Sequence, residues 1–105
     1  MNSKELILAK IKTTVLSIEP DATVILYGSF ARGDNRSDSD MDILILVDKE
    51  KITRDDEKKI THPLFKLELA TNQVISPFIK PKKTWYELYP NTPLFINIKN
   101  EGIVL

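Results

Sequence analysis

The sequence contains no cysteine, which excludes disulfide bonds and zinc sites built from thiolates. Excess charge of either sign is also missing, because 15 lysine and arginine residues balance 15 aspartate and glutamate residues. A balanced chain lacks the overall positive potential that DNA- and RNA-binding proteins use, so nucleic acid is not an expected partner. The balance leaves open a local binding site for a small charged ligand.

Long apolar runs are missing too. No stretch approaches the roughly 18 residues of a membrane-spanning helix, and the first ten residues, MNSKELILAK, lack the apolar core of a cleavable signal peptide. With 105 residues, 42% of them apolar and 29% charged, the chain has an ordinary globular composition and enough length for one modest core. We therefore expect a single cytoplasmic domain over residues 1–105, with no membrane partner.

Hydrophobic spacing predicts the first helix and two strands. Apolar side chains recur at helical intervals over residues 3–18, and Asn2 followed by Glu5 favours a helix start there. Residues 22–28 and 41–47 are apolar and rich in β-forming residues. Continuous apolar strands of this kind indicate a sheet that helices cover.

The second half of the chain predicts further short elements. Thr53 is suited to cap a second helix, which Pro63 is expected to kink or break. A short strand is expected at 73–79, a helical turn or packed loop at 85–89, and a last helix at about 94–100. The order α-β-β-α-β-α implies an α/β (α+β) domain, with a small mixed β-sheet flanked by helices.

Two aspartates stand at the entrance of the second strand. Asp40 and Asp42 are two residues apart, so on a strand they share one face and lie roughly 7 Å apart along the backbone. Two like charges beside a buried strand are costly unless something neutralises them. Mg²⁺ prefers carboxylate oxygens, so the pair is a candidate metal site.

A Gly-Ser pair follows the first strand. Gly28 has no side chain, so the backbone there can approach a phosphate closely, and Ser29 adds a hydroxyl and an N–H group at an expected helical turn. Arg32, one turn later, is within reach of phosphate oxygens. Each feature alone is usually a turn, a solvated loop or a surface arginine. Their combination with Asp40 and Asp42 is harder to attribute to chance.

The stretch GSFARGDNRSDSDMDILILV resembles the nucleotidyltransferase superfamily that includes DNA polymerase beta. The resemblance is to the minimal, stand-alone branch, whose signature is Gly-Ser, about ten residues, then Asp-X-Asp. It is strong over residues 22–47 and weak over the rest of the chain. The matching residues are Gly28, Ser29, Asp40 and Asp42, with Ala31, Arg32, Gly33 and Ser39 in the branch's common extension.

The resemblance implies a nucleotidyltransferase fold and a chemistry. A nucleoside triphosphate binds with two Mg²⁺ ions held by Asp40 and Asp42, while the Gly-Ser turn, Arg32 and Ser39 hold phosphates. An acceptor hydroxyl attacks the α-phosphorus and pyrophosphate leaves. AMP from ATP is the expected group, and a separate helical partner protein, as in antitoxin–toxin pairs, is one candidate acceptor. The chain is too short to hold a separate substrate domain, and a homodimer is another way to supply one.

A third carboxylate, which the family usually carries on a neighbouring strand, is not evident. Ile75, Ser76 and Pro77 stand where it is expected, and a serine hydroxyl is a poor substitute for an acid. Glu68 would reach the site if its segment were a strand; on a helix it would be a surface charge. The alternative function is therefore a degenerate family member that binds nucleotide or a partner protein without catalysis.

Overall fold

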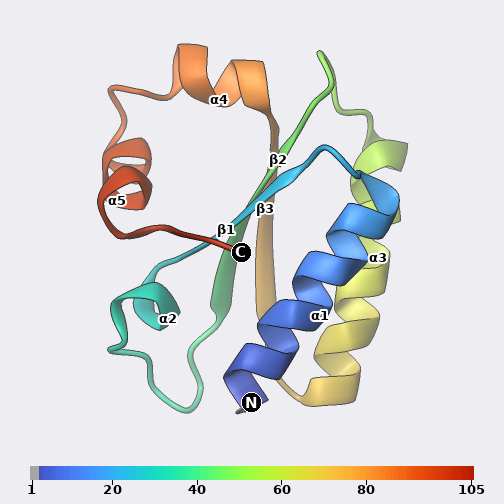
Figure 1. Cartoon of the computed structure of the whole chain (residues 1–105), viewed down its shortest axis with the longest axis vertical. Helices are drawn as coiled ribbons and strands as arrows, with labels where there is room; N and C mark the ends of the chain where they lie inside the picture. The colour runs from blue at the N-terminus through green and yellow to red at the C-terminus, as the bar shows by residue number, and fades with distance from the viewer. Residues whose placement is uncertain (1–2) are drawn as a thin grey trace.

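The computed structural model describes residues 3–105, so the predicted role of Asn2 lies outside the described part. The chain folds into three layers, with a four-stranded sheet between helices α1 and α3 on one face and α4 and α5 on the other (Figure 1). The elements are α1 Ser3–Ile18, β1 Thr23–Tyr27, α2 Ser29–Arg32, β2 Met41–Val47, α3 Arg54–Thr71, β3 Ile75–Pro81, α4 Lys82–Leu88, α5 Pro93–Glu101 and β4 Ile103–Val104.

The sheet is mixed, as the sequence predicts. Its strands lie in the order β3-β2-β1-β4. β1 runs antiparallel to both of its neighbours, β2 and β4, whereas β2 and β3 are parallel. The α3 crossover makes the parallel pair possible, because parallel strands need a long connection between them. No helix in the range 3–105 combines the length and apolar character needed to cross a bilayer.

Strand β2 is buried on both faces, and its side chains alternate between the two helical layers. Met41 and Ile43 pack with α1 and α3, whereas Leu44 and Leu46 pack with α4 and α5. Asp42 belongs to the second set by this alternation. Its side chain therefore lies on the face of the sheet that α4 and α5 cover, at the end where β2 begins.

Aromatic side chains fill the layer between the sheet and α4–α5. Trp85 is only 3% exposed and stacks on Tyr89, with 5.1 Å between ring centroids. Phe78 and Phe95 contact Trp85 from β3 and α5. Aromatic residues at this spacing act as core, because they bury large apolar areas.

Helix α3 corrects one prediction. It continues through Pro63 without a break, although proline removes a backbone hydrogen bond from the helix interior. The flanking residues explain this, because Ile60 and Leu64 are each 1% exposed and pack into the core. Burial of both turns outweighs the local cost of the proline.

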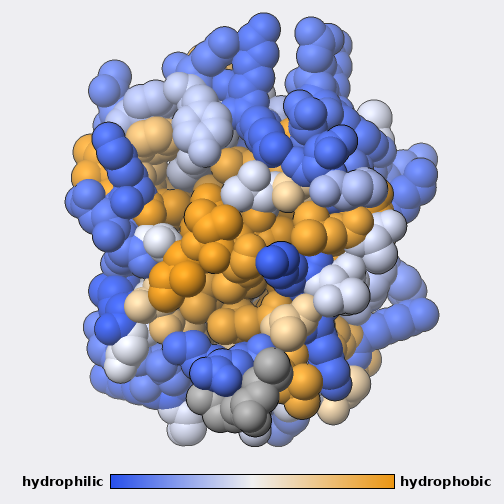
Figure 2. Space-filling model, viewed as in Figure 1, coloured by the Kyte–Doolittle hydropathy of each residue, from blue (hydrophilic) through white to orange (hydrophobic). Residues whose placement is uncertain are grey.

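The C-terminal residues correct a second prediction. The sequence pattern predicts no element after the last helix, but Ile103 and Val104 form β4 and pair with β1. Both side chains are exposed, and Figure 2 shows apolar surface gathered where Figure 1 draws the C-terminus. The predicted element order leaves out α2 and α4, which the sequence indicates only as a helical turn at Ser29 and as a helical turn or packed loop at 85–89. Strand β3 begins two residues later than expected, after Asn72 ends α3 in a left-handed conformation.

A capping box starts α3. The Thr53 hydroxyl accepts the Asp56 N–H, and the Asp56 carboxylate accepts the Thr53 N–H. Hydrogen bonds from the Thr53 backbone, Lys49 and the Thr53 side chain lower the pKa of Asp56. A carboxylate with a lowered folded-state pKa stabilises the fold above its unfolded pKa, and this contribution is lost as the pH falls through the folded value.

Thr53→Ala should lower the free energy of unfolding by about 1 kcal/mol at neutral pH, because the Asp56 N–H loses the hydroxyl that accepts its hydrogen bond. The difference from wild type should shrink as the pH falls through the lowered pKa of Asp56, because the Thr53 side chain is one of the groups that lower that pKa. Urea unfolding across this pH range measures both effects. Thr13→Ala, on the exposed surface of α1, is the control and should cost little. A difference that stays constant down to pH 2 would contradict the role of Asp56.

Candidate active site

The turn between β1 and α2 is pressed against the start of β2. Gly28 has φ 76° and ψ −155°, a conformation that is essentially restricted to glycine. A Cβ atom at this position would overlap Asp42 Oδ2 and would lie 3.3 Å from Asp42 Cγ. The absence of a side chain at position 28 thus makes room for the Asp42 carboxylate beside the turn.

Asp40 and Asp42 influence one another electrostatically. Partial burial, and then the negative charge of Asp40, raise the pKa of Asp42, while the nearby Arg32 guanidinium lowers it. Asp40 is exposed just before the strand, and Asp42 is half-buried within it. The structure therefore brings the two predicted acids and Arg32 into one neighbourhood at the Gly28 turn.

Ser29 opens α2. Its carbonyl accepts the N–H groups of Gly33 and Asp34, at 2.9 and 3.1 Å, which closes the short helix. Within residues 3–105, neither its hydroxyl nor its N–H group has a protein partner. Both remain available to a ligand.

Ser39 has a different environment. Its hydroxyl accepts the Arg36 N–H at 2.7 Å, and its carbonyl accepts a hydrogen bond from Gln73. These contacts hold the loop that leads into β2. The structure thus gives Ser39 a role within the loop, beside Asp40.

Two residues that the motif did not indicate lie at the same turn. Glu101, the last residue of α5, accepts hydrogen bonds from the Gly28 N–H and from Arg32. Tyr27 pairs with Asp42 across the antiparallel strands, and burial followed by the Asp42 charge raises the pKa of its hydroxyl. The motif spacing carries no signal for Glu101, because 73 residues separate it from Gly28.

Arg32 is held by two carboxylates. Its Nε donates to Asp34 at 3.2 Å, and its Nη1 lies 3.2 Å from both carboxylate oxygens of Glu101. These hydrogen bonds, with the Glu101 contribution the largest, raise the pKa of Arg32. The side chain remains about half exposed, so the guanidinium is ordered but accessible.

Comparison with known proteins shows the family of the chain. Residues 8–103 match the nucleotidyltransferase domain family. The chain belongs to this family. The predicted family and the predicted nucleotidyltransferase activity class are thereby confirmed.

Two similar proteins refine the family assignment. A protein of Methanocaldococcus jannaschii, named "putative protein adenylyltransferase", is 40% identical over 91 residues, which cover 87% of this chain and 84% of that protein. A chain in a crystal structure of a toxin–antitoxin with AMP-PNP superposes with a TM-score of 0.63 at 17% identity, covering 99% of this chain and 72% of that one. At that identity the second likeness shows the fold alone, and it confirms the predicted fold class.

Strand β3, Ile75–Pro81, carries no acid beside Asp42 in the place of a third carboxylate. The parallel register pairs Asp42 with Ser76 of β3, so serine occupies the position next to the acid on the same face. Glu68 lies on α3, in the layer that covers the opposite face of the sheet. Its Oε1 accepts the Ile75 N–H at 2.8 Å, which anchors the start of β3. The structure therefore does not bring Glu68 to the Asp42 face.

Nucleotidyltransferases generally use divalent metal ions, and the acids at this turn fit one. Among residues 3–105 no group of three or more acidic or histidine side chains gathers to enclose a metal. Mg²⁺ does not need such a cage, because it is commonly bound by one or two carboxylates together with substrate phosphates and water. Asp40 and Asp42 supply two carboxylates of this kind in one neighbourhood.

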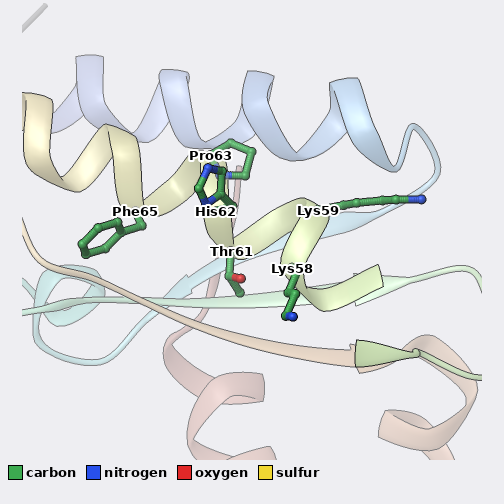
Figure 3. A pocket seen from close by; sticks show the side chains of 6 residues that line it. All are labelled: Lys58, Lys59, Thr61, His62, Pro63 and Phe65. Carbon is green, nitrogen blue, oxygen red and sulfur yellow. The ribbon is translucent and has the colours of Figure 1, made fainter. Parts of the chain in front are cut away.

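His62, the single histidine of the chain, lies elsewhere. It lines a surface hollow of about 670 Å³ along the outer side of α3, together with Pro63, Phe65 and nearby lysines (Figure 3). The helix layer that carries it covers the face of the sheet opposite to Asp42. The hollow therefore belongs to a different part of the surface from the nucleotidyltransferase motif.

Gly28→Ala should lower the free energy of unfolding by about 2–3 kcal/mol. Alanine is strained in the backbone conformation of Gly28, and its Cβ would displace the Asp42 carboxylate. Gly33→Ala is the matched control. Gly33 also has a positive φ, 82°, but open space surrounds its would-be Cβ, so about 1 kcal/mol is expected. Urea unfolding of both variants makes the comparison, and equal losses would contradict the clash with Asp42.

Proposed function

We propose that this nucleotidyltransferase transfers AMP from ATP to a hydroxyl group of a partner protein, in a reaction that depends on Mg²⁺. The observation that carries the proposal is the position of the Asp42 carboxylate directly against the Gly28–Ser29 turn. This arrangement combines acids suited to a cation with free donors suited to phosphate oxygens. The relative named for protein adenylylation is the reason for choosing AMP and a protein acceptor.

Different residues of the site bind the phosphates and the metal ion. The Ser29 hydroxyl and N–H group, together with Arg32, bind the phosphates of ATP. Asp40 and Asp42 hold Mg²⁺, which when bound supplies positive charge against the triphosphate. The acceptor oxygen attacks the α-phosphorus, the bond between this phosphorus and the bridging oxygen of the β-phosphate breaks, and pyrophosphate leaves. The hydroxyl proton passes to solvent, because the residue of β3 that is paired with Asp42 is Ser76 and not an acid.

A comparison and an exposed apolar surface both support a separate protein as the acceptor. The similar toxin–antitoxin structure is an assembly of proteins, which supports a partner of that kind for this chain. Exposed apolar residues at β4, Ile103 and Val104, offer surface of the type that protein partners cover. They adjoin a hollow of about 400 Å³ between β4, α4 and α5 that Trp85 and Phe95 help to line.

Transfer is tested by incubating the purified protein with each of the four nucleoside triphosphates and with the protein encoded beside it, followed by mass measurement. We expect a mass increase of one AMP on the partner with ATP. Asp42→Asn should abolish it, whereas Glu68→Gln should transfer at the wild-type single-turnover rate, because Glu68 lies on the opposite face. A loss of about 10²–10⁴-fold in Glu68→Gln would instead identify Glu68 as a base. Nucleotide binding without any mass increase would favour a binding role over transfer.

Mg²⁺ dependence is tested by calorimetry of ATP binding. Removing Mg²⁺ with a chelator should weaken binding by about ten-fold or more, because two carboxylates would then face the triphosphate unshielded. Asp40→Asn and Asp42→Asn should each lose much of the Mg²⁺ effect. Asp38→Asn, an exposed acid in the same loop, is the matched control and should retain it. Equal affinities with and without Mg²⁺ would contradict the metal site.

A further inference from the structure

The C-terminal segment is fitted closely onto β1. β4 pairs with β1, and the Leu105 N–H donates to the Val24 carbonyl at 2.9 Å. Between α5 and β4, Gly102 has no room for a side chain, because a Cβ there would lie 2.5 Å from the Ile98 carbonyl oxygen and 2.9 Å from Ile25 Cγ2. The close packing at Gly102 determines where the preceding residue, Glu101, lies.

Glu101 is seated at the nucleotide-binding turn. One carboxylate oxygen accepts the Gly28 N–H at 3.3 Å, and both lie 3.2 Å from Arg32 Nη1. The Glu101 side chain is 21% exposed, so these contacts are partly shielded from water. The Arg32 side chain, however, is 48% exposed, so its ion pair with Glu101 is open to solvent and adds little to stability; its effect is to orient the guanidinium.

One nitrogen of the Arg32 guanidinium, Nη2, is left for a ligand. Asp34 binds Nε and Glu101 binds Nη1, while Nη2 has no protein acceptor among residues 3–105. An arginine held in this way has already lost the rotational freedom that binding would otherwise cost. Its remaining N–H groups can then meet a phosphate at a smaller entropic penalty.

We infer that Glu101 is a positioning residue for the triphosphate of the nucleotide, acting through Arg32 and the Gly28 turn. The inference rests on the proposed function, because it assigns Arg32 to the phosphates. It connects the last segment of the chain to a site whose other residues lie between positions 28 and 42. Glu101 approaches the turn through Gly28 and Arg32, so its role is to orient donors, while Asp40 and Asp42 bind the cation.

Glu101→Gln separates this role from a structural one. Glutamine keeps an oxygen for the Gly28 N–H but loses the charge that holds Arg32. We expect the Kd and KM for ATP with Mg²⁺ to rise about three- to ten-fold, the cost of ordering one long side chain on binding. The turnover number should change less than KM. Glu19→Gln is the matched control, because Glu19 forms a similarly shielded ion pair with Lys49 away from the site. It should lose comparable stability on thermal unfolding and leave the Kd unchanged.

A double-mutant cycle with Arg32→Gln completes the test. If Glu101 acts through Arg32, adding Glu101→Gln to Arg32→Gln should cause no further loss of ATP affinity. Additive losses would overturn the inference, as would unchanged or tighter ATP binding by Glu101→Gln; tighter binding would make Glu101 a competitor of the phosphates. In each of these outcomes the wild-type protein still binds ATP, so they overturn the role of Glu101 and leave the proposed transfer to its own test. A wild-type protein that fails to bind ATP with Mg²⁺ overturns both proposals.

Discussion

The Asp42 carboxylate occupies the space that a side chain at position 28 would fill. The site depends on the absence of a side chain at that position. Because Gly28 yields that space, the turn after β1 can lie directly against the start of β2. The positive φ of Gly28 also directs its N–H toward Glu101 and starts α2 at Ser29. The acid that we propose binds the cation and the donors that we propose bind phosphate thereby lie together where the antiparallel strands β1 and β2 meet α2.

The central position of β2 gives Asp42 its surroundings. Alternation along the strand assigns Met41 and Ile43 to the α1–α3 layer and Asp42 and Leu44 to the other face. A register shift of one residue would bury the carboxylate under α1 and α3 and expose an apolar side chain in its place. The apolar run of β2 therefore holds the acid in position, although none of its residues belongs to the site.

The C-terminal segment brings a distant part of the chain to the same turn. β4 contains only two residues, yet its pairing with β1 and the close packing at Gly102 leave Glu101 beside Arg32. The turn is consequently bounded by residues from both ends of the sequence, since Lys4 of α1 also donates to the Phe30 carbonyl at 3.0 Å. Local geometry at the nucleotide site thus depends on long-range packing.

Local patterns in the sequence determined much of this protein. The apolar spacing of residues 3–18, the β-rich runs 22–28 and 41–47 and the Gly-Ser and Asp-X-Asp signature predict the first elements and the family, because each depends on neighbours only a few residues apart. Only the tertiary structure decided that Glu68 faces away from Asp42, that Ser76 stands beside it and that Glu101 reaches the turn. Those placements follow from which strands pair and which face each helix covers, and interactions between residues tens of positions apart set both.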